Sequence, residues 1–535
     1  MDSAHANVPA EVVLGKCSHT DLVRGWSGVD VVFSAADGRA WTVPAFMDSN
    51  GVCKARFAAP EPGEYGWESR STENGPGVSK GTLTVDPYQG GNPLYRHGRI
   101  GVGESRRYLQ HADGTAFFWL ADTWWMGLCT RLRWPADYRT LVADRVRKGF
   151  SVVQMVAGPL PEFCATTQTW NRQQGNEGGL SWQPEWRGLN PAYYDAADRR
   201  IVYLVDQGLV PCIVGMWGYY LPFMGVQKAK EHWRNLIARY AAYPVVWCLA
   251  GEARMPTYAF QRNSEQVRKF REIQMDGWTE VARYVKNVDP YHNVLTIHPD
   301  ANGLEQVHDP SLLDIVMVQT GHGGHHIIPR ALSLLNRVLA DAPDKPVLNA
   351  EPCYEGILGT GWQEVQRFMF WSSICSGACG HTYGAQGIWA MNSRDEPFEV
   401  TNCDWGAGYL QDAMHYRGSL QVGLGRRFIS QFPFPDFLPL AEPGLTDERP
   451  YPFVAGIPGH VRIYYFGADC FDDSLRGMRN LALSVEPGAR YDARYFDPRT
   501  GVNHGLAPAR GDSSGRWRPP PAPSREDWVL LLTRE

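Results

Sequence analysis

The sequence predicts an α/β protein in which a (β/α)8 barrel is flanked by two small all-β sandwich domains. A chain of 535 residues is too long for one hydrophobic core. Its middle part alternates apolar strands with amphipathic helices, whereas both end parts contain short strands broken by turn residues. We therefore expect an N-terminal sandwich over residues 1–90, a barrel over 95–430 and a C-terminal sandwich over 435–535.

The two end parts show the same pattern of short strands. In the first, segments such as VDVVFSA and KGTLTVDPY carry β-branched and aromatic residues between Asp-Gly, Pro-Gly and Asn-Gly turns. This spacing is typical of a small immunoglobulin-like sandwich. The last hundred residues return to such segments, including VRIYYFGAD and DWVLLLTRE.

The middle part contains eight apolar strand candidates separated by helical segments. Each helical segment has apolar residues at spacings of three and four and ends with Gly or a polar turn. Eight such units over roughly 300 residues fit a TIM barrel, whereas a doubly wound sheet would need a G-x-G-x-x-G turn after its first strand. The strand candidates are residues 116–125, 150–158, 209–218, 244–252, 293–299, 314–322, 345–352 and 380–389.

Charge, hydropathy and cysteine content indicate which binding partners and which cellular compartment to expect. A net charge of −5 gives no electrostatic reason to expect nucleic acid or an anionic membrane. No apolar run is long enough to cross a bilayer, and the N-terminus lacks the pattern of a secretory signal. The 11 cysteines show no paired spacing, so we expect reduced core thiols in a cytoplasmic protein. The oligomeric state is left open.

Catalytic groups of TIM barrels lie at the C-terminal ends of the strands. Only the fourth and seventh strand candidates end in a glutamate directly after an apolar run, Glu252 and Glu351. The other strand ends carry polar or aromatic residues, which we expect to bind substrate. These candidates are Asp122, Trp124, Gln154, Trp217, His298, Gln319, His322, Tyr354, Tyr383 and Trp389, and His381 lies beside them.

Two carboxylates across a barrel mouth are suited to glycoside hydrolysis. One must protonate the leaving group and the other must attack the anomeric carbon, at a separation of about 5–5.5 Å when configuration is retained. An isolated glutamate here would more often cap a helix or pair with a cation such as Arg254. Because two glutamates end strands four and seven, catalysis by Glu252 and Glu351 is favoured.

The segments FFWLADTWW, DRVRKGFSVVQ, PVVWCLAGE and KPVLNAEPCYEG resemble the barrel of the apiosidase-like glycoside hydrolases, within clan A. The resemblance implies flanking β-modules, Glu252 as acid/base and Glu351 as nucleophile. Two features depart from the family pattern. Gly251 stands where most clan A enzymes have Asn, and related sequences often have Asp at the position of Glu252.

Two clusters of possible metal ligands occur in the sequence. Cys375, Cys379 and His381 have a C-x3-C-x-H spacing, and a glycine-rich loop carries three histidines, His322, His325 and His326. Neither matches the spacing of a closed zinc site, so we expect no metal and no cofactor.

The segment 158–190 is long for a βα loop and contains three tryptophans. We expect it to wall off one end of the cleft and to favour exo-action. The sequence thus predicts a retaining exo-glycosidase that releases a terminal sugar, such as a furanoside of apiose or arabinose, from an oligosaccharide or glycoside. A non-catalytic carbohydrate-binding protein and a metal-dependent hydrolase using the histidine loop are the alternatives.

Overall fold

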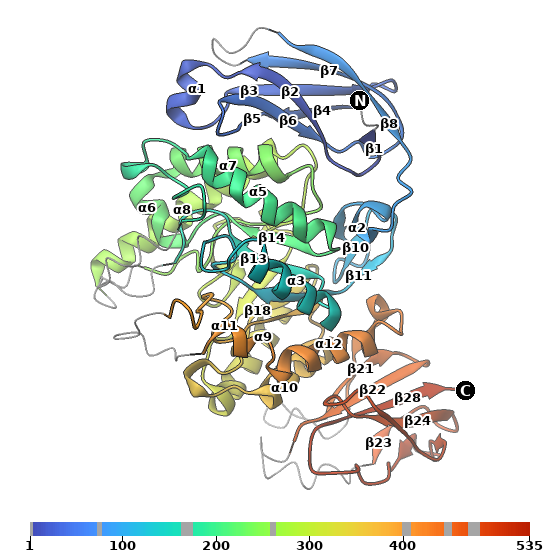
Figure 1. Ribbon diagram of the computed structural model, residues 1–535. Helices are drawn as coiled ribbons and strands as arrows, with labels where there is room; N and C mark the ends of the chain where they lie inside the picture. Colours follow the sequence, from blue (N-terminus) through green and yellow to red (C-terminus); the bar gives the residue numbers. More distant parts are fainter. Residues whose placement is uncertain are drawn as a thin grey trace.

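A computed structural model describes residues 4–71, 78–161, 175–256, 264–397, 408–442, 452–468 and 482–535. Figure 1 shows an N-terminal β-domain above a central barrel and a C-terminal β-domain below it. This architecture confirms the fold class predicted from the sequence. Within the described ranges, no helix is both long and apolar enough to cross a membrane.

The N-terminal part packs two sheets face to face. One has the order β1-β8-β7-β3-β4 and the other the order β2-β6-β5. Val31 and Phe33 of β3 point inward, and the Phe33 ring stacks on Phe57 at 4.2 Å between centroids. The elements are β1 (Ala4–His5), β2 (Ala10–Lys16), α1 (His19–Arg24), β3 (Val29–Ala35), β4 (Ala40–Pro44), β5 (Phe46–Met47), β6 (Val52–Phe57), β7 (Gly63–Ser71) and β8 (Lys80–Asp86).

A disulfide in this part corrects the expectation that all thiols are reduced. Cys17 and Cys53 are bonded, with their Cα atoms 5.3 Å apart. The antiparallel ladder pairs Lys16 with Val52, which brings the two cysteines together although they are 36 positions apart in sequence. The other cysteines that the structure describes are free and buried, as expected: Cys129, Cys212, Cys248, Cys353, Cys375 and Cys379.

The barrel is an eight-stranded parallel sheet with the order β16-β15-β14-β13-β12-β19-β18-β17. Each strand lies within one of the eight segments predicted from the sequence. The strands are β12 (Trp119–Thr123), β13 (Val152–Val156), β14 (Val210–Val214), β15 (Val246–Cys248), β16 (Leu295–Thr296), β17 (Val316–Gln319), β18 (Val347–Glu351) and β19 (Gly380–Tyr383).

Helices surround the barrel sheet, and a small sheet with the order β11-β10-β9 precedes it (Figure 1). Helix α8 is a long amphipathic example: Ser264 caps its N-terminus by accepting from the Val267 amide, and its apolar face is buried. The α-helices are α2 (Pro93–Arg96), α3 (Ala136–Lys148), α5 (Pro191–Asp206), α6 (Leu221–Met224), α7 (Val226–Tyr240), α8 (Glu265–Val288), α9 (Ile328–Asp341), α10 (Gln363–Cys375), α11 (Leu410–Ala413) and α12 (Arg417–Ile429). The small strands are β9 (Ile100–Val102), β10 (Leu109–His111) and β11 (Ala116–Phe117), and the 3-10 turns are η1 (Pro184–Trp186), η2 (Gly218–Tyr220), η3 (Gly303–Glu305), η4 (Pro310–Leu312), η5 (Gly324–Ile327), η6 (Ile357–Gly359) and η7 (Phe434–Asp436).

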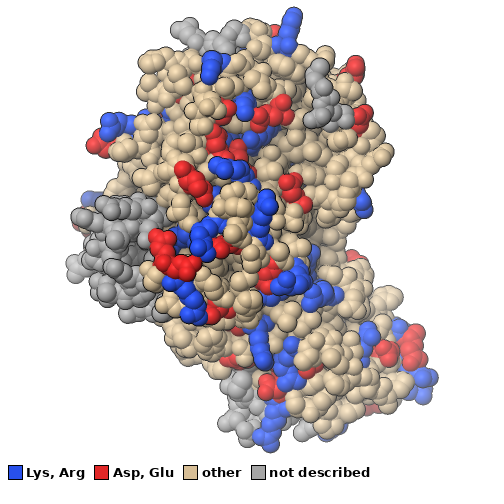
Figure 2. Space-filling model, viewed as in Figure 1, with Lys and Arg blue, Asp and Glu red and all other residues tan. Residues whose placement is uncertain are grey.

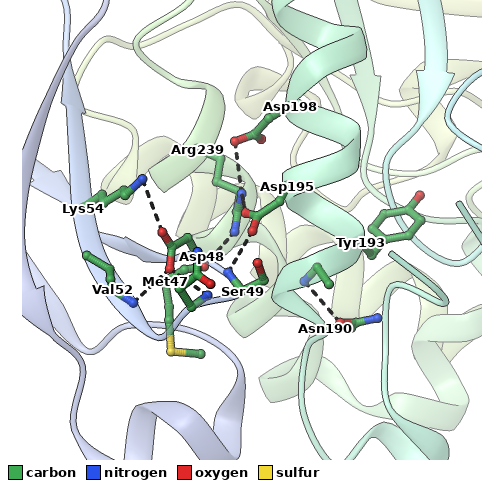
Figure 3. Close-up of polar contacts among 12 residues, drawn as sticks. Met47, Asp48, Ser49, Val52, Lys54, Asn190, Tyr193, Asp195, Asp198 and Arg239 are labelled. Atoms are coloured by element: carbon green, nitrogen blue, oxygen red, sulfur yellow. Dashed lines mark hydrogen bonds and ion pairs between the residues drawn. The ribbon is translucent and has the colours of Figure 1, made fainter. Parts of the chain in front are cut away.

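Buried ion pairs join the N-terminal sheets to the barrel (Figure 3). Arg239 of α7 donates to Asp195 at 3.0 Å, to Asp198 at 3.1 Å and to the Met47 carbonyl at 2.7 Å. Arg56 of β6 donates to the same Asp198 oxygen at 2.7 Å. Figure 2 shows acidic and basic side chains intermixed where these two parts meet. Because an unpaired buried charge costs several kcal/mol, these contacts fix how the two parts dock.

The C-terminal part is a sheet with the order β20-β21-β22-β28-β24-β25, with β26 beside β24 and a separate pair β23-β27. It packs on the barrel through α10, where Arg367 forms a buried ion pair with Asp527 at 2.7 Å. The strands are β20 (Leu438–Pro439), β21 (Phe453–Ile457), β22 (Val461–Phe466), β23 (Leu483–Ser484), β24 (Arg490–Phe496), β25 (Asn503–Gly505), β26 (Ala509–Arg510), β27 (Arg516–Trp517) and β28 (Trp528–Arg534).

Candidate active site

Glu252 and Glu351 lie at the C-terminal ends of β15 and β18. Glu351 is the last residue of β18 and is only 5% exposed. Glu252 follows β15 in a turn, is partly exposed, and has a φ of +42°. The turn is held on both sides, because Gly251 donates to the Met216 carbonyl and Ala253 donates to the His298 carbonyl, both at 3.0 Å. Such over-determined backbone is needed to keep a non-glycine residue in the left-handed region.

One side-chain amide joins the two carboxyl groups. The Gln319 nitrogen donates to Glu252 Oε1 at 3.0 Å and to Glu351 Oε1 at 3.4 Å. Gln319 ends β17, so the three side chains come from the ends of three different strands. The two glutamates that the sequence singled out therefore face one another in a single site.

Two histidines contact Glu351. His322 Nε2 lies 2.8 Å from Glu351 Oε1, and His298 Nε2 lies 3.3 Å from Glu351 Oε2. The Tyr354 amide nitrogen lies 3.4 Å from His322 Nδ1, and Nε2 is the ring nitrogen that faces Glu351. The rings of His322 and Tyr354 pack at 4.6 Å between centroids.

The surroundings separate the pKa values of the two carboxyl groups. For Glu252, burial and the nearby charge of Glu351 raise the pKa to about 8, although the Gln319 bond lowers it. For Glu351, burial acts upward but hydrogen bonding and charge from His322, with the charge of His298, bring the net pKa below its usual value. At neutral pH the arrangement holds one proton donor and one carboxylate, as a retaining acid and nucleophile require.

The Trp217 ring covers Gly251, the residue before Glu252. A Cβ atom at Gly251 would meet ring carbons of Trp217 at 2.3 Å. Trp217 also lowers the pKa of Glu252, against the effect of burial. An Asn at this position would therefore clash with the Trp217 ring in this chain.

Several residues predicted to contact substrate point away from this site, toward the helices that surround the barrel. Asp122 is fully buried and bonds Arg145 of α3 at 2.6 Å, and the Trp124 indole donates to Asp122 at 2.6 Å. Tyr383, also buried, donates to Glu355 at 2.6 Å. The structure thus places Asp122, Trp124 and Tyr383 in a network on the outer side of the strands.

Two further candidates, Gln154 and Trp389, hydrogen-bond residues other than the two glutamates. Gln154 is buried and donates to Thr123 at 2.9 Å and to the Ala350 carbonyl at 3.1 Å. Trp389 donates to Gln386 at 2.9 Å, and its ring lies 6.4 Å from that of Tyr354.

Sequence reasoning missed Trp125 and Glu355. The Trp125 ring packs edge-on against Trp217 at 5.3 Å and against His298 at 5.1 Å, so it lines the site where Trp124 was expected. Alternation along the strand end was the available signal, because neighbouring residues point to opposite faces. Glu355 is buried beside Tyr383, and its pKa is raised to about 7 by burial.

The histidines of the two clusters considered as metal sites lie in different surroundings. His322 faces Glu351, whereas His325 and His326 are exposed, and His325 lies 3.6 Å from Glu364. His381 is buried, and burial lowers its pKa to about 3. Within the described ranges, three possible metal ligands come together only at Cys17, Asp21 and Cys53, where the two thiols form the disulfide.

The long loop after β13 is described in part, since residues 162–174, and with them Trp170, lie outside the described residues. Its start lies beside the site, where the Trp217 amide donates to the Pro159 carbonyl at 3.0 Å. Its later part packs on the barrel: the Trp182 indole donates to His232 at 3.3 Å, and Trp186 packs against Tyr220 at 5.7 Å.

Several solved structures that resemble this fold are described as glycoside hydrolases. A Bacteroides vulgatus protein assigned to the glycoside hydrolases matches with a TM-score of 0.71 and 16% identity, over 100% of both chains. A second glycoside hydrolase matches with a TM-score of 0.64 and 21% identity, over 83% of this chain and 98% of the other. A family 5 glycoside hydrolase from Bacteroides vulgatus matches with a TM-score of 0.63 and 19% identity, over 82% and 94% of the two chains.

The sequence identifies the family more narrowly. Residues 103–436 match the apiosidase-like catalytic domain. This match covers more than half of the chain, so the protein belongs to the apiosidase-like family of glycoside hydrolases, and its substrate is a carbohydrate. No curated protein sequence matches it.

Proposed function

We propose that the protein is a retaining, exo-acting glycoside hydrolase that releases a terminal sugar by double displacement, with Glu351 as nucleophile and Glu252 as acid/base. The bridge by Gln319 carries this proposal. The Oε1 atoms of the two glutamates cannot be farther apart than the sum of 3.0 Å and 3.4 Å. This limit on one pair of oxygens is compatible with the separation of about 5–5.5 Å between the carboxyl groups of retaining enzymes, which is shorter than the roughly 6.5–9.5 Å of inverting enzymes.

In the first step the ionised Glu351 attacks the anomeric carbon. The bond to the leaving oxygen breaks while Glu252 transfers its proton to that oxygen, so the leaving group departs as a neutral alcohol. The product is a glycosyl ester of Glu351, and Glu252 is now a carboxylate. His322 orients Glu351 for the attack through its hydrogen bond, and His322 and His298 both favour its ionised form.

In the second step Glu252 acts as a base. It takes a proton from a water molecule, whose oxygen attacks the anomeric carbon and displaces Glu351 as a carboxylate. Glu252 regains its proton, and two inversions give net retention. The partly exposed position of Glu252 suits it to exchange protons with a leaving group and then with water.

The proposal includes the type of sugar that is released and its removal from the end of the substrate. A terminal furanoside, such as apiose or arabinofuranose, is supported by membership of the apiosidase-like family. Exo-action is supported by the loop that begins at Pro159 beside Trp217 and would close one side of the site. We propose no cofactor, no nucleic acid and no membrane as partners.

The opposite pKa shifts distinguish this proposal from a non-catalytic binding protein. Binding a neutral sugar does not require one carboxyl group to stay protonated while its neighbour stays ionised. The metal-dependent alternative relied on the histidine loop, of which only His322 faces Glu351 while His325 and His326 are exposed. No described contact favours that alternative.

A screen of aryl glycosides tests the proposed function. We expect hydrolysis of one furanoside, and retained activity after treatment with a chelator. Oligosaccharides should lose single sugars from one end, as followed by chromatography over time. Activity on pyranosides alone would contradict the furanoside, release of internal fragments would contradict exo-action, and loss of activity on chelation would favour the metal-dependent hydrolase.

A further inference from the structure

A β-bulge in β18 brings Glu351 to the face of the sheet on which Gln319 lies. Strands β17 and β18 run in register up to Val318 and Asn349, and then Gln319 pairs with Glu351 because the register shifts by one residue. Without that shift Gln319 would pair with Ala350, whose side chain points to the opposite face of the sheet from that of Glu351. Bulges beside active sites commonly re-aim a side chain in this way.

The contacts also fix which way the Gln319 amide points. An ionised carboxylate can only accept hydrogen bonds, and the low pKa of Glu351 keeps it ionised. The amide nitrogen therefore faces the glutamates, because the opposite orientation would place the amide oxygen against the charge. Among the residues that the structure describes, the amide oxygen has no hydrogen-bond partner, so nothing else sets its orientation.

From this geometry we infer that Gln319 is a positioning residue that holds Glu252 and Glu351 at a fixed separation and donates to whichever of them carries the negative charge. The inference rests on the proposed double displacement. Before the first step the charge is on Glu351, and afterwards it is on Glu252, which has given its proton to the leaving oxygen. A donor with two hydrogens lying between both oxygens serves each state without rotating.

Each of the two carboxyl groups has its own set of neighbouring groups besides Gln319. Glu351 faces His322, His298 and Tyr354, and Glu252 faces Trp217 and the charge of Asp300. The histidines thus stabilise charge on Glu351, whereas Gln319 donates to Glu252 at the shorter of its two distances. Loss of the Gln319 amide should therefore affect most the step in which Glu252 is ionised.

Replacing Gln319 with Leu tests the inference through the acid/base. Removal of a donor to the ionised form raises the pKa of Glu252, so the alkaline limb of kcat/KM should move to higher pH. We expect kcat to fall about tenfold or more, the order that a hydrogen bond to a charged group supports. Deglycosylation should slow more than glycosylation, so the glycosyl-enzyme should accumulate and be visible by mass spectrometry.

A direct titration separates this inference from the proposed function. The side-chain carboxyl carbons of Glu252 and Glu351 are followed by 13C NMR against pH in the wild type and in Gln319→Leu, with assignments from Glu252→Gln and Glu351→Gln. The titration of Glu252 should move upward whether or not a substrate is known. A wild type inactive on all glycosides would refute the proposed function and leave this readout intact.

Two further variants keep the test decisive. Gln421→Leu also removes a buried, hydrogen-bonded glutamine, but one that contacts Arg367 and the Arg499 carbonyl, and it should leave both titrations and kcat unchanged. Gln319→Asn keeps the amide one methylene short of the pair and should reproduce the shift if the Leu variant does not fold. Unchanged titration of Glu252 and a kcat within twofold of wild type in the Gln319 variants would overturn the inference.

Discussion

Glu252 and Glu351 are the same residue type in different surroundings. Burial and a neighbouring negative charge act on Glu252, whereas two histidines act on Glu351. Gln319 lies between them and contacts both. The opposite pKa shifts of the two glutamates therefore follow from their neighbours and not from their own chemistry.

The profile of kcat/KM against pH should be bell-shaped and broad. Activity requires ionised Glu351 and protonated Glu252, so it should fall as pH drops through the lowered pKa of Glu351 and as pH rises through about 8. His322→Ala removes a donor that lowers the pKa of Glu351, so the acidic limb should move to higher pH. His325→Ala, an exposed neighbour in the same loop, should leave both limbs in place. An acidic limb unmoved by His322→Ala would contradict this account of Glu351.

Gly251 should not tolerate a side chain. The Cβ of Gly251→Ala would lie 2.3 Å from the Trp217 ring, so the ring or the turn that carries Glu252 must shift. Overpacking of this kind costs about 1–3 kcal/mol, and displacement of Glu252 should lower kcat at least tenfold. Gly66→Ala on β7 is the control, since its Cβ would meet nothing within 4 Å. A fully active Gly251→Ala enzyme would show that Trp217 can move away freely.

The strand-end rule predicted which strand ends converge, but not which of the candidate side chains face the two glutamates. It brought together Glu252, Glu351, Gln319, His322 and His298 because the carboxyl ends of parallel strands converge. The rule gives a residue's height along the strand but not the face it points to.

Asp122 and Tyr383 show the consequence. They are register partners, and both lie on the face that meets Arg145 of α3. A shift of one residue along a strand exchanges the two faces, so neither could be placed from the sequence alone.

At the scale of elements, α10 connects the active-site barrel to the C-terminal sheet. Its Arg367 donates to both oxygens of Asp527, with exposed fractions of 3% and 1% for the two side chains. Gln421 of α12 accepts from the same guanidinium at 2.7 Å. The C-terminal sheet is thereby attached to two barrel helices through one buried arginine.

Arg367→Ala should strongly destabilise this attachment. It leaves the Asp527 charge buried without its cation, which typically costs about 3–5 kcal/mol. Arg394→Ala is the matched control: it breaks an exposed ion pair with Asp412 and should change the free energy of unfolding by less than about 1 kcal/mol. Urea unfolding followed by tryptophan fluorescence measures both. Equal effects of the two changes would show that water reaches Asp527.

The barrel strands were predictable because their hydrophobic pattern is strong. All eight barrel strands fell within the predicted segments, because buried parallel strands are short continuous apolar runs. The bulge between β17 and β18 was not predictable, since a register shift leaves no mark in composition. It is this bulge that aligns Gln319 with Glu351.

At the scale of the whole molecule, the disulfide bears on where the protein works. Bonds such as Cys17–Cys53 persist in oxidising compartments and are rare in the cytosol, whereas the sequence predicted a cytoplasmic protein with reduced thiols. The pair could not be found from spacing, because a β-ladder brings the cysteines together across 36 positions. Cytoplasmic location stays a prediction.

Reduction of the disulfide should destabilise the N-terminal sheets. Closing a loop of this length stabilises a fold by about 3–4 kcal/mol in the chain-entropy model. A reductant should therefore lower the Tm of the wild type, and it should leave that of Cys17→Ser/Cys53→Ser unchanged. The bond can also be tested in the cell. The protein is alkylated as it is extracted from its native compartment, and mass spectrometry then counts the cysteines that have reacted. If all cysteines react there, the cytoplasmic prediction stands and the bond does not form in the cell.

Azide rescue tests the central claim, that Glu351 is the nucleophile and Glu252 the acid/base of a retaining enzyme. Glu351→Ala should lose turnover, and azide should then yield a glycosyl azide of inverted configuration. Glu252→Ala should still form the glycosyl-enzyme from substrates with good leaving groups, and azide should yield the retained product. The configuration of each azide is read by 1H NMR. Exchanged configurations would reverse the two roles, and a loss of less than about tenfold in both variants, or 1.4 kcal/mol, would place the chemistry elsewhere.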